Sequence, residues 1–196
     1  MLAGKGFTNI YNLAGGIRAF DGAAAVGSQD LGLALFEGKE SGPEALLVAF
    51  GLETGLKEFY VTQENAAAAP EVKALFNKLG GIEVKHQDRL VVEYNRLTGK
   101  TATREELETL TSGPDMEGGL TTEEYLNLFN PDLESVVDIV SIAISIEGQA
   151  LDLYMRAAAD SSDKEGHHML MQMADEEKTH MTLLGDLLDQ VLAAPE

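Results

Sequence analysis

Apolar and small residues recur at helical spacing along most of the chain after residue 40, and this pattern predicts four long helices. The predicted helices cover residues 41–65, 70–97, 130–159 and 163–192. Short turns join the first helix to the second and the third to the fourth, whereas a long connection, residues 98–130, lies between the two pairs. Within that connection we expect a short helix over residues 121–129. Two helical hairpins joined by one long crossover predict an all-α four-helix bundle of the ferritin-like kind.

The predicted helix starts carry side chains that can satisfy free backbone N–H groups. Ser41 with Glu44, and Ser162 with Glu165, have the S-x-x-E spacing of a capping box. Asn130 precedes a proline, and we expect it to cap the third long helix, with the proline in the first turn.

The first 40 residues differ from the rest, because they are rich in glycine and alanine. We therefore divide the chain into a short N-terminal segment, residues 1–40, and a bundle, residues 41–196. Residues 8–13 form a short apolar stretch that predicts a strand, and residues 23–39 have the composition of a linker. Four apolar residues of that linker need a surface to cover them: Leu31, Leu33, Leu35 and Phe36.

A set of two glutamates and one histidine occurs twice along the bundle with the same spacing. The two sets are Glu53, Glu83 and His86, and Glu147, Glu177 and His180. In each set the first glutamate precedes a Glu-x-x-His motif by 30 residues (83 − 53 and 177 − 147). A shift of 94 residues carries the first set onto the second, and it also carries Tyr60 onto Tyr154.

The spacing of the two sets predicts that all six side chains meet at the bundle centre. In each hairpin the two glutamates lie about equally far from the turn, so they reach the same level, and Glu and His three apart share one helix face. One Glu from each of two helices, with Glu-x-x-His from the other two, is the ligand pattern of di-iron and di-manganese proteins. We expect two iron ions about 3.5–4 Å apart, with one histidine on each, and manganese or zinc as alternative occupants.

A simpler interpretation is that these residues are ordinary surface glutamates and histidines. Glu165 and His168 also fit the Glu-x-x-His spacing, but they lie in the first turn and on the opposite face of their helix, so we expect them to be solvated. Glu53 and Glu147, in contrast, lie in strongly apolar segments. Burying four carboxylates without partners is costly, whereas two divalent cations would neutralise them. An empty vestigial site is the alternative.

Tyr60 and Tyr154 follow the first glutamate of each set by seven residues and therefore share its helix face. Each tyrosine could simply fill the core. Because both take part in the repeat, we favour a role in which the hydroxyl orients a ligand carboxylate.

Composition excludes several classes of function. A net charge of −19 argues against nucleic acid or an anionic membrane as a partner. The chain has no apolar run long enough to span a membrane and no apolar signal-peptide core near its start, so we expect a cytoplasmic protein. The absence of cysteine excludes disulfides, thiol chemistry and Cys-ligated zinc or iron centres within this chain.

Residues 41–192 resemble the rubrerythrin and ferritin-like superfamily. The resemblance rests on the segments LETGLKEFYVTQEN, GIEVKHQDRL, SIEGQALDLYMRAA and ADEEKTHMTLL. It implies a non-haem di-iron centre that reacts with hydrogen peroxide or dioxygen. Two features depart from typical rubrerythrins, which carry a four-cysteine rubredoxin-like domain and a further glutamate three residues after the third-helix ligand. This chain has no cysteine, and Ala150 stands at that position.

The N-terminal segment MLAGKGFTNIYNLAGGIRAFDG resembles the C-terminal end of a rhodanese domain, with Phe20 where that family often has tryptophan. This resemblance predicts that residues 1–22 are the remnant of a rhodanese domain in a longer fusion protein. The catalytic-cysteine loop of such domains is missing, so we expect no sulfur transfer by this chain.

Three functions remain open on the sequence alone. We favour a di-iron peroxidase or oxidase that reduces hydrogen peroxide or dioxygen with electrons from an external donor. An iron-oxidising or iron-holding protein is the second, and a metal-binding module without turnover is the third. We also expect a homodimer, because Leu46, Leu47, Val48 and Phe50 make the first long helix apolar over a wide arc.

Overall fold

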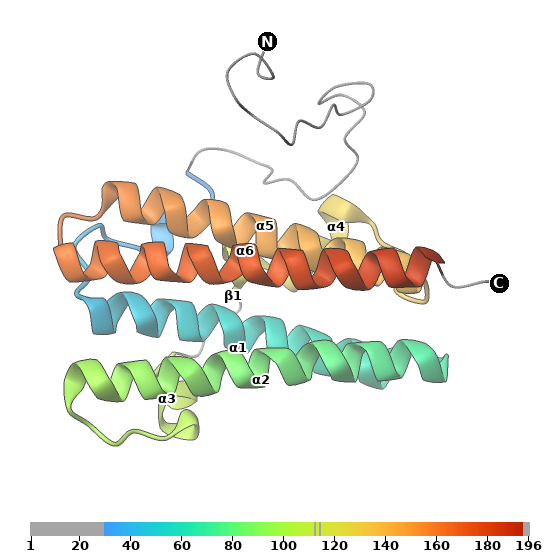
Figure 1. The fold of residues 1–196 in the computed structure, drawn as a ribbon, viewed down its shortest axis with the longest axis horizontal. Coiled ribbons are helices and arrows are strands. Elements are labelled where there is room, and N and C mark those ends of the chain that lie inside the picture. The colour runs from blue at the N-terminus through green and yellow to red at the C-terminus, as the bar shows by residue number, and fades with distance from the viewer. Residues whose placement is uncertain (1–29, 112, 114, 194–196) are drawn as a thin grey trace, which may run out of the picture.

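The computed structural model describes residues 30–111, 113 and 115–193, which form an all-α bundle of four long helices (Figure 1). The long helices are α1 (Gly42–Ala66), α2 (Pro70–Thr98), α5 (Val136–Asp160) and α6 (Lys164–Ala193). The smaller elements are a 3-10 turn η3 (Leu33–Leu35), α3 (Arg104–Leu110), β1 (Asp115–Met116), the turn η4 (Glu117–Gly119), β2 (Leu120–Thr121) and α4 (Thr122–Phe129). Helices α1 and α2 form one antiparallel hairpin and α5 and α6 the other, as the sequence predicted. No helix in the described part of the chain is both long and apolar enough to cross a membrane.

The apolar core is split into two clusters along the bundle axis. One cluster contains Leu46 and Phe50 of α1 together with Leu90 of α2. The other contains Leu56 of α1 and Leu79 of α2. Helices α5 and α6 contribute to both clusters in the same way. Each long helix therefore passes from one apolar cluster to the other through a short polar stretch at mid-length.

The start of the third long helix differs from the prediction. Asn130 is the C-terminal cap of α4, with a left-handed φ of 44° and its N–H bonded to the carbonyl of Leu126. Helix α5 begins only at Val136, and its cap is Ser135, whose side chain accepts the N–H of Asp138. Asparagine tolerates the left-handed conformation and a following proline stops a helix, so the Asn-Pro pair ends one here instead of starting one.

The cap of the last helix also differs from the prediction. Asp163 Oδ1 accepts the N–H groups of Glu165 and Gly166, at 3.0 and 2.8 Å, and so takes the capping role. The hydroxyl of Ser162 instead donates to the carbonyl of Gly38 at 2.9 Å. The capping box of Ser41 and Glu44 at the start of α1 is confirmed.

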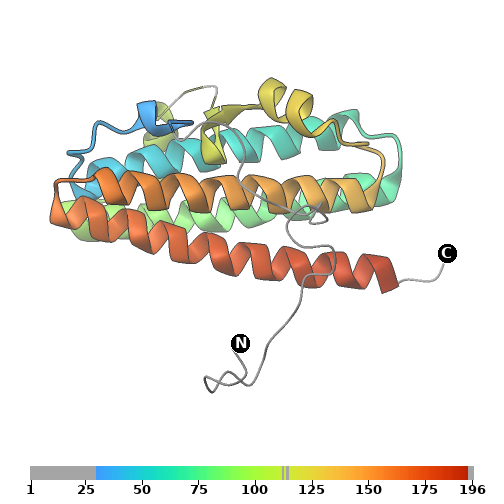
Figure 2. The same ribbon diagram turned by 90° about the horizontal axis from the view of Figure 1, so that it is seen from above.

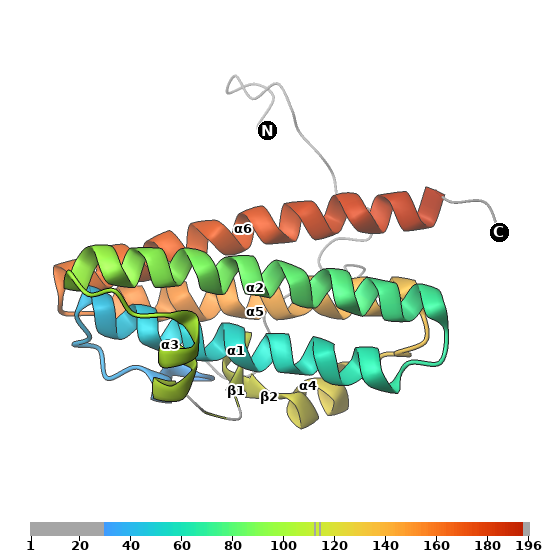
Figure 3. The same ribbon diagram turned by 90° about the horizontal axis from the view of Figure 1, so that it is seen from below.

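The crossover between the hairpins, residues 99–135, contains more structure than the sequence predicted. The expected short helix is confirmed as α4, whereas α3 and a small β-hairpin were missed. In this crossover hairpin, residues 115–121, β1 pairs antiparallel with β2, so that Asp115 faces Thr121 and Met116 faces Leu120. The hairpin packs against α1 and α5, on the side of the bundle away from α2 and α6 (Figures 2 and 3).

The described end of the N-terminal segment packs on the bundle. Phe36 is buried in the core cluster that contains Leu46, and Leu33 and Leu35 pack against the same cluster. The carbonyl of Leu31 accepts a hydrogen bond from Arg156 Nη1 at 3.0 Å. The predicted strand at residues 8–13 and the rhodanese-like segment lie outside the described residues.

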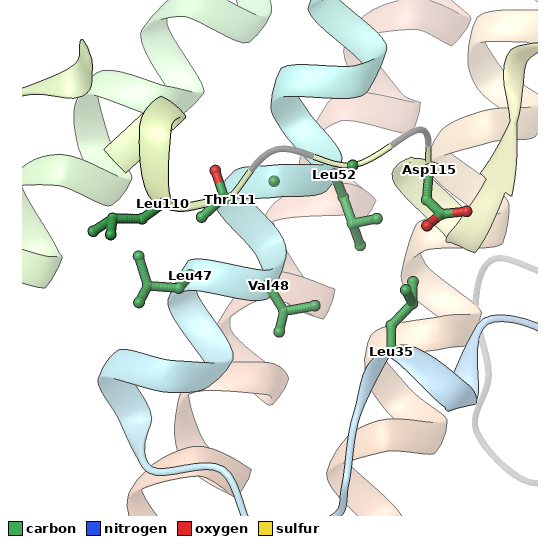
Figure 4. A pocket seen from close by; sticks show the side chains of 9 residues that line it. Leu35, Leu47, Val48, Leu52, Leu110, Thr111 and Asp115 are labelled. Atoms are coloured by element: carbon green, nitrogen blue, oxygen red, sulfur yellow. The ribbon is translucent and has the colours of Figure 1, made fainter. Parts of the chain in front are cut away.

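The wide apolar arc of α1 is partly covered by the chain itself. Leu46 and Phe50 point into the core. Leu47 and Val48 line a hollow of about 340 Å³ whose other walls include Leu35 and Leu110 (Figure 4). Because the crossover and the N-terminal segment shield this side of α1, its apolar arc is weaker evidence for a dimer than the sequence suggested. The homodimer stays a prediction.

Candidate metal centre

The polar layer between the two apolar clusters contains all six side chains of the repeated sets. Glu53 comes from α1, Glu83 and His86 from α2, Glu147 from α5, and Glu177 and His180 from α6. Each of them is buried, with between 2% and 7% of its surface exposed. In each set the potential ligand atoms of the three side chains lie within 4.8 Å of one another. We call the two sets the first and the second Glu-Glu-His group.

The two groups have nearly the same geometry. His86 Nδ1 lies 2.9 Å from Glu83 Oε2 and 3.5 Å from Glu53 Oε2. His180 Nδ1 lies 2.9 Å from Glu177 Oε2 and 3.4 Å from Glu147 Oε2. The two imidazole rings stack on each other, with centroids 3.8 Å apart and an angle of 3° between their planes. The internal repeat of the sequence thus appears as an approximate two-fold relation between the groups.

Burial changes the protonation of these side chains. It raises the pKa of Glu53, Glu83 and Glu177 well above the usual value, and the negative charge of neighbouring glutamates raises it further. Burial lowers the pKa of His86 to about 2, and the electrostatic effect of the neighbouring His180 acts in the same direction. His86 is therefore neutral at physiological pH, and its close contacts with Glu53 and Glu83 are not ion pairs.

Four polar atoms of the two Glu-Glu-His groups make no hydrogen bond of acceptable geometry, although His86 Nδ1 lies 2.9 Å from Glu83 Oε2. They are Glu53 Oε2, Glu83 Oε2, Glu147 Oε2 and His86 Nδ1. An unsatisfied buried polar group costs about 1–3 kcal/mol, so four of them in one place require an explanation. All four can donate a lone pair, and carboxylate oxygen with imidazole nitrogen is a donor set that suits iron, manganese or zinc. The residues present therefore fit a pair of metal ions.

Comparison with known protein families agrees with this geometry. The rubrerythrin family model matches residues 44–188. The chain belongs to the rubrerythrin family. The matched range contains both Glu-Glu-His groups and begins after the rhodanese-like segment, which stays a prediction. No significant match was found among curated proteins or among solved structures.

A cavity connects the surface of this rubrerythrin-family bundle with the centre. It has a volume of about 310 Å³ and reaches Glu83, Glu147 and His180. The walls of the cavity are mainly apolar and come from α1, α2 and α6. The apolar and aromatic lining residues are Tyr60, Leu79, Ile82, Leu183, Leu184 and Leu187. Lys78 and Lys85 also line the cavity. Both lysines are exposed, so the cavity has a basic mouth and an apolar interior.

The two repeated tyrosines are buried beside the centre, each about 1% exposed. Burial and then the nearby carboxylates raise the pKa of both hydroxyls well above the usual value, so both stay protonated. Among the described residues, neither hydroxyl has a hydrogen bond to a glutamate of the two groups. The orienting role of Tyr60 and Tyr154 stays a prediction.

The sequence interpretation missed one residue of the centre, Glu117. It lies at the tip of the crossover hairpin and is completely buried. Its carboxylate lies within 4.8 Å of ligand atoms of Glu53 and Glu177. Glu117 belongs to neither repeat, so the 94-residue shift could not find it. The available signal was the local sequence DMEGGLT, in which an acid and two glycines interrupt apolar residues as in a buried turn.

Glu165 and His168, which share the Glu-x-x-His spacing, are both exposed on α6. The prediction that this pair is solvated is confirmed. Spacing alone therefore does not identify the centre, and the apolar flanks of the motif are needed as well.

Proposed function

We propose that this member of the rubrerythrin family is a di-iron oxidoreductase that reduces hydrogen peroxide or dioxygen. The observation that carries the proposal is the pair of facing Glu-Glu-His groups, buried between two apolar clusters and rich in unpartnered donor atoms. A site built only to stabilise the fold would not bury so many unpaired acids.

The first Glu-Glu-His group would hold one iron and the second would hold the other. Four carboxylates balance the charge of two divalent cations, and the two imidazoles add one nitrogen donor to each metal position. When bound, the iron pair would supply electrons and a binding surface for the O–O unit. Because the two groups are related by an approximate two-fold axis, the two oxygen atoms of such a substrate would face similar sets of side chains.

The protein would contribute access and protons. The apolar cavity admits small uncharged molecules, and its walls exclude bulk water. Reduction of hydrogen peroxide to two molecules of water consumes two electrons and two protons. Tyr60 lines the cavity beside Glu83 and Glu147 and stays protonated, so its hydroxyl can donate a hydrogen bond to an oxygen atom held there.

The electrons would come from a separate donor. The sequence contains no cysteine, so it has no thiol and no Cys-ligated iron centre that could relay electrons within the chain. We also keep a cytoplasmic location as a proposal.

An iron-handling function is the second candidate. The net charge of −19 favours it, because a strongly acidic protein raises the local concentration of cations. In that case iron would be the substrate, and dioxygen or peroxide would only be the oxidant.

Rapid mixing of the anaerobic, ferrous-loaded protein with hydrogen peroxide tests the proposal. We expect about one peroxide to be consumed per iron pair, much faster than by the same concentration of free ferrous ion. Glu83→Gln is the control and should lose the fast phase. Peroxide decay no faster than that of free iron would contradict the proposal. Uptake of iron well beyond two ions per chain under air would favour the iron-handling function instead.

A further inference from the structure

We propose that Glu117 is a seventh protein ligand of the dinuclear centre, brought to it by the crossover hairpin. This inference rests on the proposed function only in that it assumes metal binding at the two Glu-Glu-His groups. It assigns a role to a side chain that lies outside the sequence repeat and outside the four long helices.

Glu117 reaches the centre from a different side of the bundle than the two histidines. Both histidines come from α2 and α6, whereas the crossover hairpin packs against α1 and α5 (Figure 3). Glu117 therefore enters from the side of the bundle opposite the helices that carry the histidines. One ligand oxygen of Glu117 lies within 4.8 Å of ligand atoms of Glu53 in the first group and Glu177 in the second, so the carboxylate lies within reach of both groups.

The backbone of the crossover hairpin holds Glu117 in a defined position. Gly118 and Gly119 follow it with left-handed φ values of 77° and 78°, which turn the chain back into β2. A Cβ atom at Gly118 would collide with the hydroxyl of Tyr125 and with Gln149. The buried Tyr125 hydroxyl donates to the backbone carbonyl of Glu117 at 2.5 Å. The glycines and the tyrosine thus fix the hairpin tip by its backbone, and the Glu117 side chain takes no part in the turn.

The Glu117 carboxylate has no partner that would explain its burial. It has no exposed surface, and neither of its oxygens has a hydrogen bond in the described structure. A turn of this kind needs the glycines but does not need an acid before them. An acid is unfavourable here without a cation, because four other carboxylates surround the same volume. Two unpartnered oxygens directed at that volume are what a bridging or capping metal ligand requires.

A fifth carboxylate also changes the charge of the loaded centre. Four carboxylates with two divalent ions give a net charge of zero, and with two trivalent ions they give +2. With Glu117 ionised the corresponding charges are −1 and +1. The fifth carboxylate therefore favours the oxidised, trivalent pair, and its removal should raise the reduction potential of the iron centre.

Glu117→Gln tests this inference, because it keeps the size of the side chain and removes its charge. Glu176→Gln is the matched control, since Glu176 lies next to Glu177 on α6 but is 26% exposed and paired with Arg89 at 3.2 Å. Anaerobic titration with ferrous ion gives affinities and stoichiometry, and titration with cobalt(II) gives an absorption spectrum that depends on coordination number. We expect Glu117→Gln to lower the affinity for at least one metal ion by about tenfold or more. It should also change the cobalt spectrum and raise the reduction potential of the iron centre. Glu176→Gln should behave like the wild type in all three.

Wild-type affinities and an unchanged cobalt spectrum in Glu117→Gln would overturn the inference and leave the proposed function intact. A wild-type protein that binds no metal would instead overturn the proposed function. Circular dichroism of the metal-free variants checks the fold. If Glu117→Gln does not fold, Glu117→Asp takes its place, because it keeps the charge but shortens the reach. For that variant we expect a lower affinity for at least one metal ion and an altered cobalt spectrum. Wild-type values for both would overturn the inference.

Discussion

The imidazole rings of His86 and His180 stack face to face, with centroids 3.8 Å apart. The two residues are related by the 94-residue repeat, and each turns its Nδ1 towards the glutamate three positions before it. Two imidazolium ions at this distance would repel each other, and His86 stays neutral because burial lowers its pKa to about 2. The pair therefore offers one nitrogen lone pair to each Glu-Glu-His group.

Replacing one histidine should affect one metal more than the other. We predict that His86→Ala lowers the iron content of the reconstituted, desalted protein from about two ions per chain towards one. His168→Ala is the control, because His168 has the same spacing from a glutamate but is exposed on α6. It should keep two ions. Equal loss of iron in the two variants would mean that the effect is not specific to the centre.

The metal-free protein should become less stable as the pH rises. Burial and mutual repulsion raise the pKa of Glu53, Glu83, Glu117 and Glu177, so the folded state binds more protons than the unfolded state above about pH 4.5. The stability that these groups contribute is present at low pH. It is lost as the pH rises towards the pKa values that the groups have in the folded state. His86 acts in the opposite direction, but only below about pH 6.5, because its pKa is lowered.

Of these groups, only the carboxylates change the free energy of unfolding between pH 6.5 and pH 8. We predict that urea denaturation of the metal-free protein gives a lower free energy of unfolding at pH 8 than at pH 6.5. Metal ions keep the carboxylates ionised, so the loaded protein should lose this dependence and should release protons on loading. A metal-free protein that is more stable at pH 8 would show that these glutamates are not buried as described.

The turn of the crossover hairpin should be intolerant of a side chain. Gly118→Ala places a residue with a Cβ in the left-handed region and also against Tyr125 and Gln149. We predict a loss of stability of about 2–4 kcal/mol in chemical denaturation, from strain and overpacking together. Gly99→Ala is the control for strain alone, because Gly99 has a φ of 67° but nothing near its Cβ position. It should cost only about 1 kcal/mol. Similar losses in both variants would show that the hairpin is not tightly packed.

The apolar cavity should control access of the oxidant. Ile82→Trp fills part of it from α2, and we predict slower oxidation of the ferrous protein by hydrogen peroxide without loss of bound iron. Val92→Trp is the control, because Val92 lies on the same helix but is 69% exposed. Rapid-mixing kinetics of the two variants give the comparison. An unchanged rate in Ile82→Trp would indicate that the oxidant enters by another path.

Most of the bundle could be predicted from the sequence, because it follows from local patterns. Helical periodicity placed α1, α2 and α6 to within a residue or two, and the repeat brought the six side chains to one level. Asn130 and Ser162 were assigned wrongly because several residue types can cap a helix at either end. The crossover hairpin was missed because two-residue strands have no periodicity. Its glutamate reaches the centre only through tertiary packing on α1 and α5.

Diffraction from crystals of the iron-loaded protein at the iron absorption edge tests the central claim most directly. We predict two anomalous peaks, about 3.5–4 Å apart, one in contact with Glu53, Glu83 and His86 and the other with Glu147, Glu177 and His180. No peak at these positions, or a single peak bound to only one of the two groups, would contradict the account.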